Sequence, residues 1–461
     1  MQQIYSNISS EIKLPEVIDL FSGCGGLALG FQMAGFQISK GLELDRDAAE
    51  VASFNLHWRK GNRESHINDD ITLLNANNFY KGMDKSKGLM VVGGPPCQAY
   101  SKIGRAKLRS LGEDRWQEND VRGKLYENFL DYALYADANI IIMENVPEAV
   151  NYDGVNIPDK VCEILIEKGY DAIWTILNSA DFGVPQTRKR LFVMAIKKDI
   201  GHIKNIPVPT HRPINDECVK KNLRDRQLRS RLSSSKYFKK PLIPESGLPK
   251  WVNVSDALTD LPDLFLDYKQ KYKNYKPMML KEYKTSPQNE FQRLMRIDNK
   301  VDKVTGNMFR NTKRDFPIFA KMLEGDNYLD AHNIAISILT KEMRKLGITK
   351  ENTDEYHLLK EKIVPPYSTE KFIGKWKKLS LNKPSHTLVA HLSTDTYSHL
   401  HPIEPRGISV REAARLQSFP DDFLFNCSMG SAFRQIGNAV PPLLAKAIAE
   451  AMKKNIQEAC L

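Results

Sequence analysis

Short apolar runs alternate with longer amphipathic stretches between about residues 15 and 196, and this pattern limits the fold more than any other feature of the sequence. The runs include EVIDLF, GLELD, LMVVGG, NIIIMENV and RLFVMAI, and the intervening VCEILIEKGY has the apolar spacing of a helix. Strands separated by helices predict a parallel sheet covered on both faces, because each crossover lays a helix across the sheet. The sequence therefore predicts a doubly wound, mostly parallel α/β domain over residues 1–196.

The chain changes character after residue 196. Residues 197–240 hold thirteen Lys and Arg against four Asp and Glu, so much of the formal net charge of +11 lies in this segment. Such a charge run is either a solvated linker or a surface for a polyanion. Residues 241–405 show no clear apolar period, and we assign residues 197–405 to a second, smaller domain of mixed structure. The last helical pattern, PPLLAKAIAEAMKK, begins with a Pro pair and has an apolar face.

Composition excludes several classes of protein. No run of about 18 apolar residues could span a bilayer, and the first residues, MQQIYSNISSEIK, lack the apolar core of a secretory signal. The six cysteines form no CxxC pair and the ten histidines no HExxH pattern, which argues against a disulfide framework and a zinc site. We therefore expect a cytoplasmic or nucleoid-associated protein with no metal and no membrane partner.

A glycine-rich turn, Ser22 to Gly26, follows the first predicted strand. A turn of this kind at the carboxyl end of a strand is where an α/β sheet binds a nucleotide-like ligand. Glu43 lies 20 positions beyond Gly23 and could accept hydrogen bonds from ribose hydroxyls, and Asp70 could hold an adenine amino group. The spacing is not GxGxxG, so a structural turn or a site for another nucleotide is about as good an interpretation.

Three further motifs carry reactive side chains. The stiff turn GGPPCQAYS presents Cys97 on a loop, although a free cysteine is more often buried and inert. The run NIIIMENVPE places Glu144 at a strand end on the same sheet edge, where it could also be a surface residue or a helix cap. In FGVPQTRKRLFV, Arg188 and Arg190 are two apart, so both would point to one side of an extended chain. A charged edge strand has the same pattern.

These residue types suit one demanding reaction, the methylation of carbon 5 of cytosine. A thiolate must first add to carbon 6 while an acid relieves the charge on ring nitrogen 3, and Cys97 and Glu144 have the chemistry for these roles. The arginine pair can hold the exocyclic oxygen at ring position 2. A stacked base cannot be reached in this way, so the target must be flipped out of the duplex.

The order of the motifs resembles that of the DNA (cytosine-5)-methyltransferase family, of the prokaryotic restriction-modification type. The successive motifs are VIDLFSGCGGLALGF, GLELD, DDIT, GGPPCQAYS, RGKLY, ENVPE and QTRKR, followed after a long gap by REAARLQSFPDDF and RQIGNAVPPLLA. They cover roughly residues 15–196 and 376–450. The resemblance implies an S-adenosyl-L-methionine-dependent methyltransferase fold and methylation of cytosine within a specific duplex DNA sequence, by base flipping and a covalent cysteine adduct. It also implies a monomer from a prokaryote or phage that protects host DNA against a cognate restriction endonuclease.

The resemblance implies a role for each matching residue. Cys97 becomes the nucleophile, Glu144 the acid at nitrogen 3, and Arg188 and Arg190 contacts to the ring and a neighbouring loop. The cofactor pocket would include Phe21, Gly23, Cys24, Gly26, Glu43, Leu44, Asp70, Ile71, Pro95, Leu125, Asn438 and Ala439. The DNA contacts would include Gln98, Ser101, Lys102, Arg105, Arg224, Arg226, Arg229 and Arg231. Some members of the family carry an aromatic residue where this chain has Leu44, so adenine stacking is in doubt there.

The same resemblance divides the chain into regions. Residues 1–196 would bind the cofactor and hold the catalytic groups, and 197–405 would form a target recognition domain that faces DNA. Residues 406–434 would form a hinge region, and the helix within 435–461 would return to the catalytic domain. A methyltransferase of exocyclic amino groups should show (D/N/S)PP(Y/F) where this chain has PPCQ. The alternatives that stay open are an RNA cytosine-5 methyltransferase and a non-catalytic DNA-binding protein.

Overall fold

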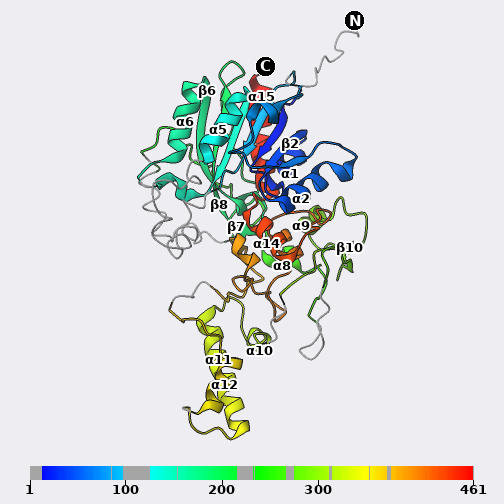
Figure 1. The fold of residues 1–461 in the computed structure, drawn as a ribbon, viewed down its shortest axis with the longest axis vertical. Helices are drawn as coiled ribbons and strands as arrows, with labels where there is room; N and C mark the ends of the chain where they lie inside the picture. The colour runs from blue at the N-terminus through cyan, green and yellow to red at the C-terminus, as the bar shows by residue number, and fades with distance from the viewer. Residues whose placement is uncertain are drawn as a thin grey trace.

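A computed structural model describes residues 13–84, 86–96, 125–152, 154–214, 232, 234–265, 275–310, 314–351, 353–370 and 375–459. A seven-stranded sheet forms the upper part of the molecule in Figure 1, in the order β3-β2-β1-β4-β5-β8-β6. Only β8 is antiparallel to its neighbours, so the expected mostly parallel sheet is confirmed. Its strands are β1 (Glu16–Leu20), β2 (Ile38–Glu43), β3 (His66–Asn68), β4 (Leu89–Gly93), β5 (Ile140–Asn145), β6 (Tyr170–Asn178) and β8 (Lys189–Lys197).

Helices cover both faces of this sheet. One face packs against α1 (Gly26–Met33), α2 (Arg46–Leu56) and α15 (Pro442–Ala459), and the other against α3 (Ala76–Tyr80), α5 (Leu125–Tyr135) and α6 (Ile157–Glu167). Successive side chains of a strand alternate between the faces, so Met90 and Val92 join the first core and Val91 the second. Burial on both sides explains why β4 and β5 are apolar runs without alternation.

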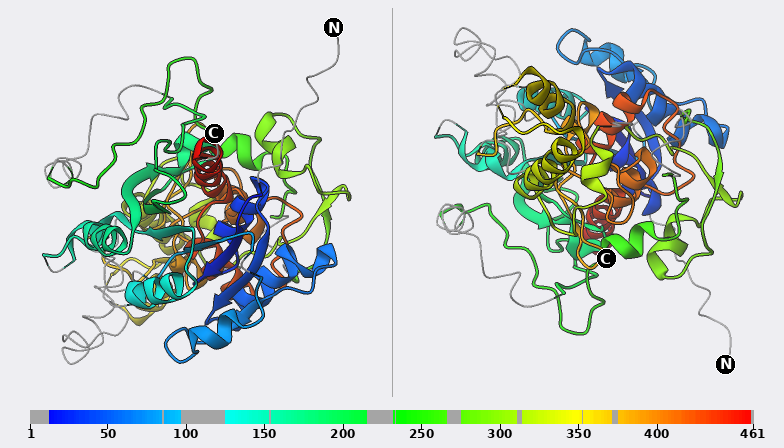
Figure 2. Two further views of the ribbon diagram at one scale, coloured as in Figure 1. Left: turned by 90° about the horizontal axis from the view of Figure 1, so that it is seen from above. Right: turned by 90° about the horizontal axis from the view of Figure 1, so that it is seen from below.

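The final helix, α15, packs against the first helix, α1. Gly30 permits this approach, because a Cβ at that position would lie 2.3 Å from the Cβ of Ala445. Seen from above, α15 lies beside the strands from the start of the chain (Figure 2). The two ends of the sequence therefore share one hydrophobic core.

The chain beyond β8 first returns along the sheet. The Asn455 side chain of α15 binds the backbone N–H and C=O of Asn205, and Trp174 of β6 exchanges backbone hydrogen bonds with Tyr237 and Lys239. The chain around residue 205 therefore packs against α15, and the chain at residues 237–239 lies alongside β6. The domain boundary expected at residue 197 stays a prediction.

The remaining helices and strands lie below the sheet in Figure 1, and most of them are short. They are β7 (Gln186–Thr187), α8 (Val254–Leu258), β9 (Lys281–Glu282), α9 (Glu290–Met295), β10 (Lys303–Val304), α10 (Phe316–Phe319), α11 (Tyr328–Leu346), α12 (Asp354–Ile363), β11 (Ser385–His386), α13 (Val410–Leu416) and α14 (Met429–Asn438). The helix pair α11 and α12 projects at the end of the molecule opposite the sheet (Figure 1). An aromatic cluster around Phe319, Tyr328 and Trp376 forms a separate core at its base.

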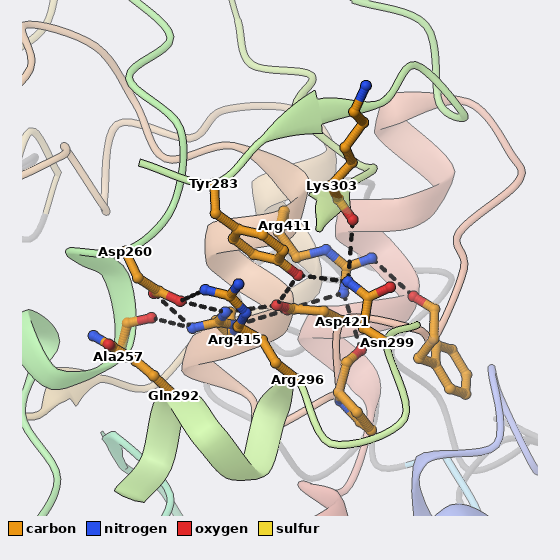
Figure 3. Close-up of polar contacts among 12 residues, drawn as sticks. Ala257, Asp260, Tyr283, Gln292, Arg296, Asn299, Lys303, Arg411, Arg415 and Asp421 are labelled. Carbon is orange, nitrogen blue, oxygen red and sulfur yellow. Dashed lines mark hydrogen bonds and ion pairs between the residues drawn. The ribbon is translucent and has the colours of Figure 1, made fainter. Parts of the chain in front are cut away.

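A buried ionic network joins α13 to the short elements. Arg415 has no exposed side-chain surface and pairs with Asp260 at 3.1 Å and Asp421 at 2.5 Å. The Tyr283 hydroxyl donates to Asp421, and the Arg296 guanidinium lies 3.6 Å from the Tyr283 ring centroid (Figure 3). Residues 406–434, expected as a hinge region, thus include buried side chains that belong to this network.

The helices in the described part of the chain include no candidate for a membrane span.

Candidate active site

The candidate site is built at one edge of the sheet, where β1, β4 and β5 end. Leu20 is in register with Gly93, and Gly93 with Met143, so the residues that follow each strand are neighbours. The antiparallel β8 starts at this edge, since Leu191 is in register with Asn145. The strand order thus gathers the glycine loop, the GGPP turn, Glu144 and Arg190, as the carboxyl edge of an α/β sheet commonly does.

The glycine loop after β1 has an unusual backbone. Phe21, Gly23 and Gly25 have φ values of 56°, 53° and 85°, in the left-handed region that a side chain such as that of Phe21 rarely occupies. The Glu43 carboxylate holds the loop, because it accepts 2.8 Å hydrogen bonds from the N–H groups of Gly23 and Asp45. Burial raises the pKa of Glu43, and the two backbone bonds oppose that shift.

A buried histidine, which no motif in the sequence indicates, also supports the loop. The His66 ring lies 2.8 Å from the Ser22 hydroxyl through Nδ1. Gly41 leaves room for the ring, because a Cβ there would lie 2.0 Å from the same nitrogen. Burial lowers the pKa of His66 to about 3, so the ring is neutral at physiological pH.

The two ends of the chain meet beside this loop. A Cβ at Gly26 would lie 2.5 Å from the carbonyl oxygen of Val440 and 3.2 Å from the Cβ of Ala439. The residues expected to line a cofactor pocket near both ends of the sequence are therefore brought together. Asn438, the last residue of α14, is exposed.

Other expected pocket residues follow β2, β3 and β4. Leu44 is 67 % exposed, whereas Ile71 is buried. The Asp70 carboxylate accepts hydrogen bonds from the N–H and the hydroxyl of Thr72 through one oxygen. Pro95 is buried next to the sheet edge, and Leu125 begins α5.

Glu144 forms an ion pair with Arg190, with 2.8 Å between a carboxylate oxygen and Nε. The other carboxylate oxygen would lie 2.9 Å from a Cβ at Gly94, so the acid lies directly against the GGPP turn. Burial raises the pKa of Glu144, while Arg190 and Arg188 lower it. The site therefore combines a carboxyl that can hold a proton with a fixed positive charge.

Arg188 and Arg190 have different surroundings. Arg190 belongs to β8, whereas Arg188 lies between β7 and β8, where the chain changes partners from β11 to β5. Both arginines lower the pKa of Glu144, and the shared side expected from their spacing stays a prediction. Its guanidinium is buried and donates to the carbonyl oxygens of Leu388, at 2.7 Å, and Gly437, at 3.1 Å. Arg188 thus connects three distant segments of the chain.

Three cysteines belong to the described part of the chain. Burial raises the pKa of the Cys24 and Cys162 thiols, and that of Cys427 to about 11, so all three favour the unreactive thiol form. Cys97 lies outside the described residues, as do all the expected DNA contacts, Gln98, Ser101, Lys102, Arg105, Arg224, Arg226, Arg229 and Arg231. Gly94, which contacts Glu144, is three positions before Cys97 in the sequence.

One cluster has the residue types of a metal site. His401, Glu404 and Glu412 bring potential ligand atoms within 4.8 Å of one another. Arg406 donates to both carboxylates, and His401 Nδ1 accepts a 2.8 Å hydrogen bond from the N–H of Glu404. The arginine offsets part of the acidic charge and pairs with both glutamates, so the cluster is held together by internal ion pairs.

The sheet order, the single antiparallel strand between β5 and β6, and the loop at the end of β1 define an α/β enzyme of the methyltransferase class. The model of the C-5 cytosine-specific DNA methylase family matches residues 16–454, so the chain belongs to that family. It is a DNA (cytosine-5)-methyltransferase.

Curated relatives agree with this assignment, and a solved structure shares the fold. M.OihORF3336P of Oceanobacillus iheyensis, provisionally assigned as a type II methyltransferase, is 75% identical over 461 residues, which is the full length of both chains. The type II methyltransferase M.AgeI of Thalassovita gelatinovora is 29% identical over 95% of this chain and 99% of its own. A crystal structure from E. coli, provisionally assigned as a prophage DNA modification methyltransferase, has a TM-score of 0.62 and 24% identity, covering 96% of this chain and 99% of that chain. This last likeness shows the common fold.

Proposed function

We propose that this enzyme transfers the methyl group of S-adenosyl-L-methionine to carbon 5 of cytosine within a specific sequence of double-stranded DNA, with Cys97 as nucleophile. The ion pair between Glu144 and Arg190 carries the proposal, because it lies against Gly94 at the edge where the glycine loop begins. A buried carboxyl with a raised pKa can act as an acid toward nitrogen 3 of a flipped cytosine. The adjacent Arg190 can hold the exocyclic oxygen at ring position 2.

The reaction assigns a bond or a proton to each side chain. The Cys97 thiolate adds to carbon 6 while the Glu144 carboxyl gives its proton to nitrogen 3, which relieves the charge and makes carbon 5 nucleophilic. S-adenosyl-L-methionine, when bound, supplies the electrophilic methyl group. Glu144 then takes the nitrogen 3 proton back, a base removes the carbon 5 proton, and the bond between carbon 6 and sulfur breaks to free Cys97.

The residues around the glycine loop fit such a cofactor. A Cβ at Gly23 would meet nothing within 4 Å, so there is open space directly over the loop. The exposed Leu44 side chain offers an aliphatic surface for adenine, and Asp70 and Asn438 offer polar groups at the partly and fully exposed edges. The proposed pocket also includes Phe21, Cys24, Gly26, Glu43, Ile71, Pro95, Leu125 and Ala439.

We assign DNA recognition to the elements between β8 and α13. Lys and Arg contacts to phosphates supply much of the affinity of DNA-binding proteins, and the basic segment 197–240 suits that task. Replacing Arg224, Arg226, Arg229 and Arg231 by Gln should weaken binding to a duplex and flatten its salt dependence. An unchanged salt slope would assign this segment to a solvated linker.

The proposed biological setting is a restriction-modification system. The two relatives described above are named as type II methyltransferases, which supports a partner endonuclease acting on the same site. We expect the enzyme to act as a monomer. Bisulfite sequencing of DNA from cells that express the protein tests both the activity and the methylated sequence.

A mechanism-based substrate tests the chemistry directly. A duplex with 5-fluorocytosine at the target site cannot lose the carbon 5 substituent as a proton, so the covalent adduct should accumulate on Cys97 in the presence of S-adenosyl-L-methionine. Mass spectrometry of the digested complex locates the adduct. The Cys97→Ser variant should form none, and Cys162→Ser should form it normally. An adduct on another residue would overturn the assignment of the nucleophile.

A further inference from the structure

We infer that Gln417 is a positioning residue that fixes the end of α14 for cofactor binding, acting through a buried chain of hydrogen bonds from β7. The inference rests on the proposed function in one respect, the assignment of Asn438 and Ala439 to the cofactor pocket. It gives a role to two glutamines of the QTRKR and REAARLQSFP motifs for which the reaction itself has no use.

The chain of hydrogen bonds begins at Gln186. This side chain is fully buried, and its Oε1 accepts a 2.9 Å hydrogen bond from the N–H of Leu388. Its Nε2 donates to the Leu416 carbonyl at 3.1 Å and to Gln417 Oε1 at 2.5 Å. Each polar atom of Gln186 therefore has a partner.

Gln417 continues the chain to α14. Its side chain is also fully buried, and its Nε2 donates a 2.6 Å hydrogen bond to the Ala439 carbonyl. The last carbonyls of a helix have no partner within the helix, so they need a donor from elsewhere. Gln417 supplies this donor for Ala439, and Arg188 supplies it for Gly437 at 3.1 Å. Two side chains from distant segments therefore hold the end of α14.

The segment after β11 completes this arrangement. Residues 388–389 lie between β7 and α14, because Arg188 also donates to the Leu388 carbonyl. Gly437 allows close packing there, since a Cβ would lie 2.3 Å from the carbonyl carbon of Val389. Three segments that are far apart in the sequence, at residues 186–188, 388–389 and 417, thus fix one helix end.

This helix end is the part of α14 that meets the glycine loop. Val440, one residue after Ala439, lies against Gly26 at the start of α1. Without the Gln417 amide, the Ala439 carbonyl and the Gln186 amide would lose buried partners, which is costly. The turn at residues 439–440 would then relax away from the loop, and cofactor affinity should fall more than DNA affinity.

The test compares two buried glutamines in the full-length enzyme. Isothermal titration calorimetry with S-adenosylhomocysteine should give a Kd about tenfold higher for Gln417→Leu than for the wild type, the equivalent of one lost hydrogen bond. The Kd for a duplex oligonucleotide should change by less than about twofold. The matched control is Gln292→Leu, which removes hydrogen bonds from another fully buried Gln to Asp256 and Thr259. It should lower the melting temperature similarly but leave cofactor affinity unchanged.

A double-mutant cycle separates positioning from general destabilisation. If Gln417 acts through the end of α14, Asn438→Ala should weaken cofactor binding less in the Gln417→Leu background than in the wild type. If Gln417→Leu does not fold, Gln186→Leu breaks the same chain at its other end and should raise the Kd about threefold. Equal Kd values for the Gln417 and Gln292 variants, or additive effects in the cycle, would overturn the inference. Absence of binding by the wild-type enzyme would instead overturn the proposed cofactor.

Discussion

Arg190 lies with its Nε 2.8 Å from a carboxylate oxygen of Glu144, at the edge of the sheet where β1, β4 and β5 end. The two residues come from adjacent antiparallel strands, so the pair depends on the reversed direction of β8. Burial raises the pKa of Glu144 and Arg190 opposes this shift. The protonation state of the acid is therefore set by a balance that one substitution can change.

Replacing Arg190 by Gln should move the pH dependence of methyl transfer. The pKa of Glu144 should rise, because the larger of its two opposing arginine effects is lost. The carboxyl then stays protonated to higher pH, so the alkaline fall in the single-turnover rate should shift upward. The maximal rate should drop about 100-fold, since a charge that stabilises the transition state is lost. Lys189→Gln, which changes the neighbouring charge, should leave the profile in place. If the rate of the Arg190 variant falls at the same pH as that of the wild type, or at a lower pH, the proposed effect of Arg190 on Glu144 is wrong.

Replacing Gly94 by Ala should disturb the acid directly. The new Cβ would lie 2.9 Å from Glu144 Oε2, closer than real Cβ contacts come, so the carboxylate or the GGPP turn must move. We expect the rate of adduct formation with a 5-fluorocytosine duplex to fall at least tenfold, with little change in melting temperature. Gly247→Ala is the control, because a Cβ there meets nothing within 4 Å. Equal rates for the two variants would show that Glu144 does not need its present position.

The sequence predicted the sheet, and the edge at which the candidate residues meet, because both depend on the local pattern of apolar residues and turns. Apolar runs mark the buried strands, and the turns that follow them fall at one edge in any doubly wound sheet. Arg188 shows the limit of local reasoning, because nothing near it in the sequence indicates that its guanidinium donates to the carbonyl groups of Leu388 and Gly437. The bond between Gln186 and Gln417 spans 231 positions and leaves no local signal. Within residues 241–405, β9 and β10 have two residues each, too few for a period. The 19-residue α11 does have a helical period, but its buried face includes the small Ala331 and Ala335 and therefore gives a weak apolar signal.

Replacing Glu43 by Ala should weaken cofactor binding more than DNA binding. The Glu43 carboxylate closes the glycine loop through Gly23 and Asp45, so its loss frees the loop and removes the proposed ribose contact. Titration with S-adenosylhomocysteine should give a Kd at least tenfold higher, the equivalent of one or more hydrogen bonds. Glu50→Ala, which removes an exposed partner of Arg46, should bind normally. Unchanged affinity in the Glu43 variant would remove this residue from the pocket.

Replacing Arg415 by Met should destabilise the folded protein far more than loss of an exposed ion pair. Arg415, Asp260 and Asp421 have no exposed side-chain surface, so the substitution leaves two buried carboxylates with weaker partners (Figure 3). Breaking such a network costs about 3–5 kcal/mol. Arg46→Ala is the control, because the Arg46–Glu50 pair has a similar length of 2.8 Å but its side chains are 80% and 54% exposed. Exposed pairs contribute about 1 kcal/mol or less.

Urea unfolding followed by tryptophan fluorescence measures the loss of stability in both variants. The loss in Arg415→Lys should fall between them, because an ammonium cannot bridge both carboxylates as a guanidinium does. Similar midpoints for Arg415→Met and Arg46→Ala would mean that the network adds little stability beyond that of a surface pair.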